Sequence, residues 1–85
     1  MVSAYLLIKT ETGKTKAIFN ELSKLLKTKH KNIVFGRYDI VLKVKTRTDD
    51  DLIALINTKI RTIQGVTTVH VLQCWEEEES TIEGA

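Results

Sequence analysis

Apolar and polar positions alternate along residues 2–9, with the period of two residues that is typical of a β-strand. The pattern therefore predicts a strand that opens the chain. One face of this strand carries Val2, Ala4, Leu6 and Ile8, and the other carries Ser3, Tyr5, Leu7 and Lys9.

Two later segments carry apolar residues at helical spacing. Thr12 is expected to cap the first helix. Thr48, which three aspartates follow, is expected to cap the second, because such side chains accept hydrogen bonds from the first free N–H groups. Gly65 fits the C-terminal cap of the second helix. The two stripes are Ile18, Leu22, Leu25 and Leu26 with Phe19 beside them, and Leu52, Ile53, Ile56, Ile60 and Ile63.

Three further strands are predicted at residues 33–35, 38–45 and 66–75, and Gly36 separates the first two of them. The order is strand-helix-strand-strand-helix-strand, which predicts an α+β, ferredoxin-like βαββαβ sandwich. This fold has a four-stranded antiparallel sheet with two helices on one face. We expect one domain over residues 1–76 and an acidic, flexible tail over residues 77–85.

Composition narrows the class of protein. The chain has 85 residues, enough for a single domain with a thin core. Its net charge of +2 is too small to indicate nucleic acid or a membrane as a partner, and no apolar run is long enough to span a bilayer. A single cysteine, Cys74, excludes a disulfide within the chain. With no basic leader at the start, these features predict a cytoplasmic protein.

Two helices cover only one face of a four-stranded sheet. If they lie over Leu6 and Ile8, the other face keeps an exposed apolar patch that is large for a monomer. Burying it between two copies would be strongly favoured, at roughly 1.5–3 kcal/mol for each large side chain. The sequence therefore predicts at least a homodimer, with partial cover by the tail as the alternative. The expected interface consists of Tyr5, Leu7, Val34, Val41, Val69, Val71 and Trp75.

No catalytic set and no metal centre are expected. His70 and Cys74 share a face, but four residues of strand separate them by about 13 Å. Zinc needs ligands at about 2.0–2.3 Å, so these two side chains do not share one ion. No cofactor motif is present. The strand at 38–45 lacks the aromatic platform of RNA-recognition domains, so direct nucleic-acid binding is not expected.

For two polar features the sequence leaves two interpretations open. The basic cluster Lys24, Lys27, Lys29, His30 and Lys31 either contacts phosphates or places cations at a helix C-terminus, where the dipole favours them. Asp39 points to the open face and needs a hydrogen-bond donor. That donor is either part of the chain, a backbone N–H or Arg37, or the ammonium group of a bound amino acid.

Three segments carry a family resemblance by their order and spacing. They are Ala4-Tyr5-Leu6-Leu7-Ile8-Lys9-Thr10 in the first strand, Gly36-Arg37-Tyr38-Asp39-Ile40 at the hairpin, and Ile60-Arg61-Thr62-Ile63-Gln64-Gly65-Val66 before the last strand. Over residues 2–75 the chain resembles the effector-binding domain of the Lrp/AsnC family, the "regulation of amino acid metabolism" domain. Family members usually carry an N-terminal helix-turn-helix, so this chain is similar to a stand-alone form without its own DNA-binding domain.

The resemblance implies dimers that pair through their open sheet faces and assemble further, into a tetramer or an octameric ring. Small effectors, mostly amino acids, would bind between dimers. By position, the ligand-binding residues would be Gly36, Arg37, Tyr38 and Asp39 on one wall and Thr67, Thr68 and His70 on the other. Family members often have threonines where this chain has Val69 and Val71, which removes hydroxyl partners.

The expected function is a non-enzymatic module of transcriptional regulation that oligomerises and binds an amino-acid effector. It could also act on full-length Lrp/AsnC relatives by mixed assembly. The alternative is a small dimeric α/β-barrel enzyme, monooxygenase-like or isomerase-like, with the same fold. Such an enzyme needs an acid–base group aimed into a pocket beneath the sheet. Only His70 could serve, and its alternation is expected to place it on the helix side.

Overall fold

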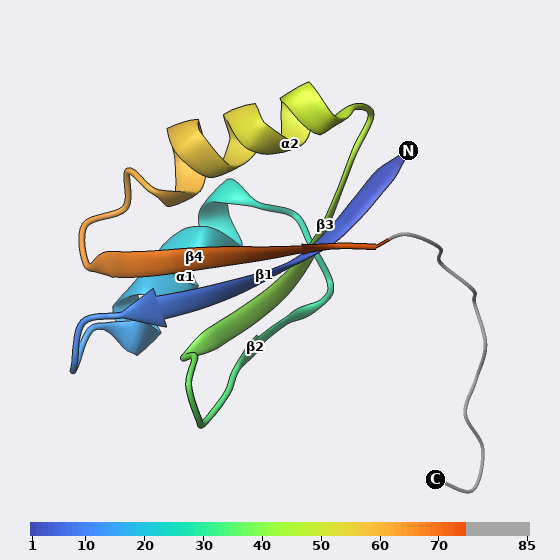
Figure 1. Cartoon of the computed structure of the whole chain (residues 1–85). Coiled ribbons are helices and arrows are strands. Elements are labelled where there is room, and N and C mark those ends of the chain that lie inside the picture. Colours follow the sequence, from blue (N-terminus) through green and yellow to red (C-terminus); the bar gives the residue numbers. More distant parts are fainter. Residues whose placement is uncertain (75–85) are drawn as a thin grey trace, which may run out of the picture.

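The computed structural model describes residues 1–74 and has the predicted element order (Figure 1). The predictions for Trp75 and for the tail at 77–85 lie outside the described residues. The antiparallel sheet has the order β2-β3-β1-β4. Its strands are β1 (Val2–Thr10), β2 (Lys31–Ile33), β3 (Ile40–Thr46) and β4 (Val66–Gln73), and the helices are α1 (Thr15–Leu25) and α2 (Asp49–Leu55), which continues into a π-helical turn, Ile56–Ile60.

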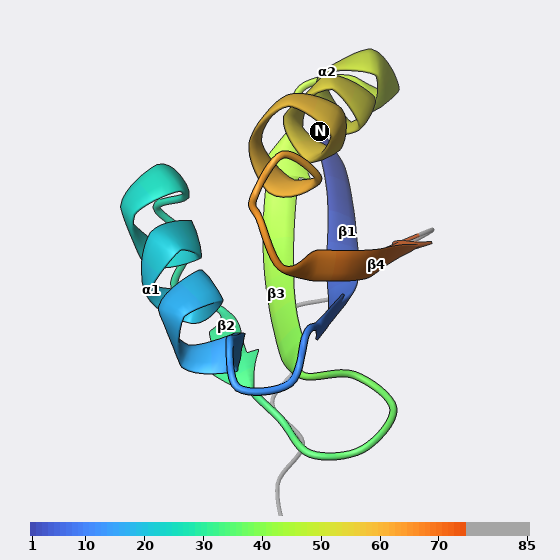
Figure 2. The same cartoon turned by 90° about the vertical axis from the view of Figure 1, so that its left-hand side faces the viewer.

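Both helices pack on one face of the sheet, as predicted (Figure 2). The core forms because alternate residues of the two central strands point to that face and meet the apolar stripes of the helices. The buried strand residues are Ala4, Leu6 and Ile8 of β1 and Ile40, Leu42 and Val44 of β3, and the buried helix residues are Ile18, Leu22, Leu52, Ile56 and Ile60. The ferredoxin-like α+β fold is therefore confirmed.

The helix ends agree with the prediction at Thr48 and differ elsewhere. The Thr48 hydroxyl accepts a hydrogen bond from the Asp51 N–H at 3.1 Å, so Thr48 is the N-cap of α2. Thr12 is not a cap: a turn in which the Lys14 N–H bonds to the Glu11 carbonyl precedes α1, whose N-cap is Lys14. Gly65 is not a C-cap either, because the π-helical turn ends at Ile60 and its C-cap is Arg61.

Two residues of the predicted apolar stripes do not lie in the core. Leu25 is 40% exposed and Ile53 is 55% exposed. Each directly adjoins a buried residue, Leu26 or Leu52, and neighbours on a helix point about 100° apart. The stripes are therefore narrower than the apolar sequence suggested.

The second strand lies two residues earlier than predicted, and the third begins two residues later. The chain leaves the ladder after Ile33, and the Val34 N–H bonds across to the Asp39 carbonyl at 2.8 Å. Residues 34–39 then form a loop in which Gly36 has a φ of +132° and Phe35 is fully exposed. Val34 and Phe35 are thus loop residues, not strand residues.

The predicted face of the last strand was wrong. Leu6 pairs with Val71 and Ile8 pairs with Val69, and directly paired residues of antiparallel strands share a face. Val69 and Val71 therefore lie on the helix side, where Val69 is 5% exposed and belongs to the core. His70 and Leu72 pair with Leu7 and Tyr5 and lie on the open face.

Among the helices of residues 1–74, none has the length and apolarity to cross a bilayer.

Candidate functional site

Asp39 ties the 34–39 loop to the end of β1. Its Oδ2 accepts a hydrogen bond from the Thr10 N–H at 2.9 Å and one from the Thr10 hydroxyl at 3.2 Å. The Thr10 hydroxyl has a single proton, so its 2.8 Å partner, the Thr15 hydroxyl, donates to it. The Asp39 N–H also bonds to the Ile8 carbonyl. The donor that Asp39 needs is therefore part of the chain, and it is Thr10 that supplies it.

Tyr38 and His70 form a pair on the open side of the sheet. A hydrogen bond links the Tyr38 hydroxyl to His70 Nδ1, and the two rings meet edge to face with centroids 5.4 Å apart. The residues are 32 positions apart in sequence: Tyr38 lies in the loop before β3, His70 lies in β4, and β1 separates these two strands in the sheet. The pair therefore joins the 34–39 loop to the last strand. The prediction that His70 lies on the helix side was wrong, because β4 has the opposite facing.

The threonines at the start of β4 lie beside the same end of β1. The Thr67 hydroxyl donates to the Lys9 carbonyl at 3.1 Å, and Thr68 pairs with Lys9 where the register shifts. Thr10, the neighbour of Lys9, holds Asp39. The structure thus gathers Tyr38, Asp39, Thr67, Thr68 and His70 around the end of β1, while Gly36 and Arg37 are exposed on the loop.

Sequence reasoning missed two residues of this surface. Thr10 anchors Asp39, and the only sequence signal was its place at the end of the first resembling segment. Leu72 is 55% exposed on the open face beside Tyr5. No local signal identifies it, because the last strand has apolar residues on both faces, Val69 and Val71 on one and Leu72 on the other.

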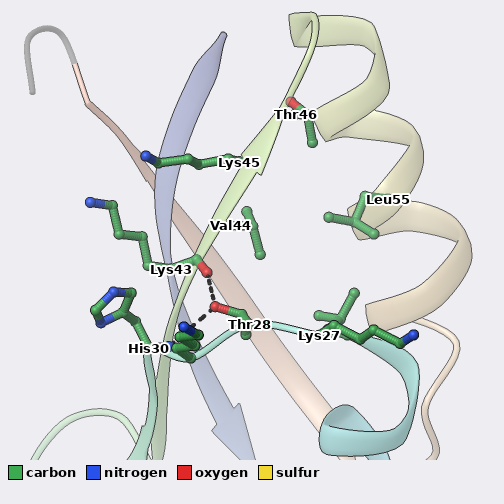
Figure 3. A pocket seen from close by; sticks show the side chains of 10 residues that line it. Lys27, Thr28, His30, Lys43, Val44, Lys45, Thr46 and Leu55 are labelled. Atoms are coloured by element: carbon green, nitrogen blue, oxygen red, sulfur yellow. Dashed lines mark hydrogen bonds between the residues drawn. The ribbon is translucent and has the colours of Figure 1, made fainter.

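A second candidate surface, called here the basic groove, lies where β3 extends beyond its pairing with β2 (Figure 3). Its volume is about 740 Å³. Leu26, Val44 and Leu55 form its apolar floor, and the hydroxyls of Thr28 and Thr46 line it as well. The Thr28 hydroxyl donates to the Lys43 carbonyl at 2.6 Å and holds the loop after α1 on β3. The basic residues along the groove are Lys27, Lys29, His30, Lys43 and Lys45, although the side chains of Lys43 and Lys45 extend to the open face of the sheet.

Only some residues of the predicted basic cluster line this groove. Lys27, Lys29 and His30 line it, whereas Lys24 lies in the last turn of α1 and Lys31 begins β2. The other two lysines along the groove, Lys43 and Lys45, lie on β3 and were not part of the predicted cluster. The Lys43 ammonium also lies 5.5 Å from the centre of the Tyr5 ring, a cation–π contact on the open face.

Comparisons with known proteins agree with this geometry. The family model described as "Lrp/AsnC ligand binding domain" matches residues 3–80. The crystal structure of FFRP-DM1 is 31% identical, with a TM-score of 0.80, over 87% of this chain and 99% of that one. The hypothetical protein PHS023 from Pyrococcus horikoshii is also 31% identical with a TM-score of 0.80, over 91% of this chain and 93% of that one.

A more distant structure shares the fold. AsnC of E. coli is 23% identical with a TM-score of 0.86, and the match covers 95% of this chain and 56% of AsnC. No curated protein matches the chain. Domains of the matched family typically oligomerise and bind small effectors, and they act in transcription regulation rather than in catalysis. With the family model matching nearly the whole chain, this protein belongs to the Lrp/AsnC family, as a ligand-binding domain of that family.

Proposed function

We propose that this domain binds an amino acid between the 34–39 loop and the start of β4. The Tyr38–His70 pair is the observation that carries the proposal, since it joins the two predicted walls on the open side of the sheet. Asp39 and Thr10 hold the loop in place, which pre-organises the site and lowers the entropic cost of binding. Thr67 and Thr68 supply hydroxyls beside the pair.

The open face is the proposed dimer interface, with the face of β4 corrected. Tyr5 is 41% and Leu72 is 55% exposed on it, and Leu7, Val34 and Val41 are half-buried. Val69 is excluded from the interface because the helices already cover it. Pairing two copies would bury the aromatic and aliphatic side chains that otherwise face water. Further assembly of dimers would place the effector site between them.

The regulatory effect would follow from this assembly. An effector bound between dimers shifts the oligomer equilibrium by as much as its affinities for the assembly states differ. Mixed assembly with full-length Lrp/AsnC relatives would transmit that shift to a DNA-bound partner, with no DNA contact by this domain.

The proposal is tested by light scattering on the purified protein, without and with each of the twenty amino acids, followed by calorimetry on any that bind. We expect an assembly larger than a dimer, or a change of size with at least one amino acid. Tyr38→Phe removes the hydroxyl bond to His70 and should weaken binding about two- to tenfold, as expected for one hydrogen bond. Thr62→Ala is the control, because it removes an exposed hydroxyl on the helical side, away from both the Tyr38–His70 pair and the open face. A dimer that is indifferent to all twenty amino acids would refute the proposed effector class.

A further inference from the structure

Phe35 is a large aromatic side chain that packs against no part of its own domain. It is fully exposed in the 34–39 loop, which projects beyond the end of the sheet (Figure 2). The base of this loop is held in place, because the Val34 N–H bonds to the Asp39 carbonyl and Asp39 accepts the bonds from Thr10. An exposed aromatic ring on an ordered loop is suited to insert into a partner, since such rings supply much of the contact area at interfaces.

A second hollow of the protein, called here the helical cleft, lies between α1 and residues 58–64. Its volume is about 360 Å³, which is room enough for a single aromatic ring. Its apolar side chains are Leu25, which is 40% exposed, and Ile63, which is half-buried. The hydroxyls of Thr58 and Thr62 at its rim donate to carbonyls one helical turn earlier, at 2.6 and 2.9 Å, so they need no partner. The cleft therefore offers an incoming ring an apolar surface.

Charge favours the helical cleft over the basic groove as the place where this loop binds. Arg37 lies two residues after Phe35, and the cations of the basic groove would repel it. The helical cleft has one carboxylate, Glu21, on the α1 wall and one ammonium group, Lys59, on the opposite wall. Within residues 1–74, neither Arg37 nor Glu21 forms an ion pair, so both charges are available to a partner.

The spacing of the two halves of this contact also agrees. Glu21 and Leu25 are four residues apart on α1, so their Cβ atoms lie about 5–6 Å apart on one face. Phe35 and Arg37 are two residues apart in a loop, so at most about 7 Å separates their Cα atoms. A ring packed on Leu25 therefore brings Arg37 within reach of Glu21. The Lys59 ammonium, on the opposite wall, can then face the ring as in a cation–π contact.

We propose that Phe35 of one copy inserts into the helical cleft of another copy, with Arg37 paired to Glu21. Ring and cleft are different surfaces of one chain, so the contact is head-to-tail and repeats from copy to copy. Together with a dimer through the open face, it links dimers into a ring or a larger assembly. The 34–39 loop is also one wall of the proposed effector site, so a bound effector would act on this contact. That link rests on the proposed function, whereas the contact itself does not.

The test is light scattering over a dilution series, without any amino acid. Phe35→Ser should weaken association beyond the dimer about 10- to 100-fold, as expected when a buried aromatic ring is removed. Leu25→Arg should have a similar effect, because it places a cation where Arg37 enters. Ile53→Arg is the matched control, since it makes the same change at an exposed helical position outside the cleft, and it should leave the size unchanged. A parent chain and a Phe35→Ser variant of equal size at every concentration would overturn the proposal.

Mixing the two variants tests the head-to-tail geometry. The Phe35→Ser chain keeps its cleft and the Leu25→Arg chain keeps its ring, so an equimolar mixture should form larger assemblies than either variant alone. Likewise, Glu21→Arg and Arg37→Glu should each weaken association about two- to fivefold, and the double variant should regain most of the loss. A mixture that keeps the size of the separate variants would also overturn the proposal. Because no amino acid is present, these outcomes do not depend on effector binding.

Discussion

Gly65 shows how one residue fixes the geometry between the two halves of the chain. Its φ of +101° lies in the left-handed region, which side chains other than hydrogen disfavour. Its carbonyl accepts a hydrogen bond from the Glu11 N–H at 2.8 Å, which joins the turn after β1 to the turn before β4. A Cβ at this position would lie 2.9 Å from Cδ1 of Ile18, a core residue. Both the backbone and the packing therefore require glycine.

Gly65→Ala should destabilise the domain more than Gly13→Ala does. Gly13 also has a positive φ, +85°, but open space surrounds its Cα, so alanine there costs only the backbone strain of about 1–2 kcal/mol. At Gly65 the same strain adds to overpacking against Ile18, worth about 1–3 kcal/mol. Urea unfolding of the two variants measures the difference. Equal losses of unfolding free energy would show that Ile18 moves aside without cost.

At the scale of elements, the two helices start in different ways although a threonine precedes each. Thr48 has an extended backbone and its hydroxyl accepts from the Asp51 N–H, with Asp49, Asp50 and Asp51 in the first turn. These acidic groups meet the positive end of the helix dipole. Thr12 lies in a turn two residues before the actual cap, Lys14, which makes no side-chain capping bond. The stability of helix α1 therefore comes more from the packing of Ile18 and Leu22 than from capping at its N-terminus.

Thr48→Ala should lower the free energy of unfolding by about 1 kcal/mol, the usual value of an N-cap hydroxyl. Thr12→Ala makes the same chemical change at the rejected cap and should stay within about 0.5 kcal/mol of the parent, as exposed substitutions usually do. Thermal and urea unfolding of both variants give the comparison. A large loss at Thr12 would mean that the turn before α1 contributes more than the structure indicates.

At the scale of the whole molecule, the open face of the sheet is the main surface left for assembly. Its apolar side chains come from β1, β3 and β4, with Lys43 packed over the Tyr5 ring among them. Leu72 and Ile53 have equal exposure, 55%, but Leu72 lies on this face and Ile53 on the outer side of a helix. Substitutions at these two positions therefore distinguish assembly through the sheet from a general effect of exposed apolar area.

Leu72→Glu should weaken dimerisation about 10- to 100-fold or more, because it removes an apolar contact and buries a charge at the proposed interface. Ile53→Glu should leave the oligomer size unchanged. Light scattering over a dilution series distinguishes the two. If Ile53→Glu dissociates the assembly and Leu72→Glu does not, the helical side is the interface and the proposed dimer is wrong.

The sequence by itself determined the order of the elements, the face of the two central strands and the fold. Alternation in β1 and β3 and the helical stripes are local patterns, and they match the buried residues Leu6, Ile8, Ile40 and Leu42. The three resembling segments were enough to indicate the family that the family model confirms. Local chemistry also predicted the cap at Thr48, because a cap bonds only to its own first turn.

Only the tertiary structure decided the contacts between segments distant in sequence. Residues 66–75 have apolar side chains on both faces of the strand, so their sequence does not decide which face is buried. The register of β4 with β1 decides it, and this register places Val69 in the core and His70 on the open face. The same register brings His70 to Tyr38, and the loop geometry brings Asp39 to Thr10. These contacts depend on strand pairing across the whole sheet, and no local pattern of apolar and polar residues contains that information.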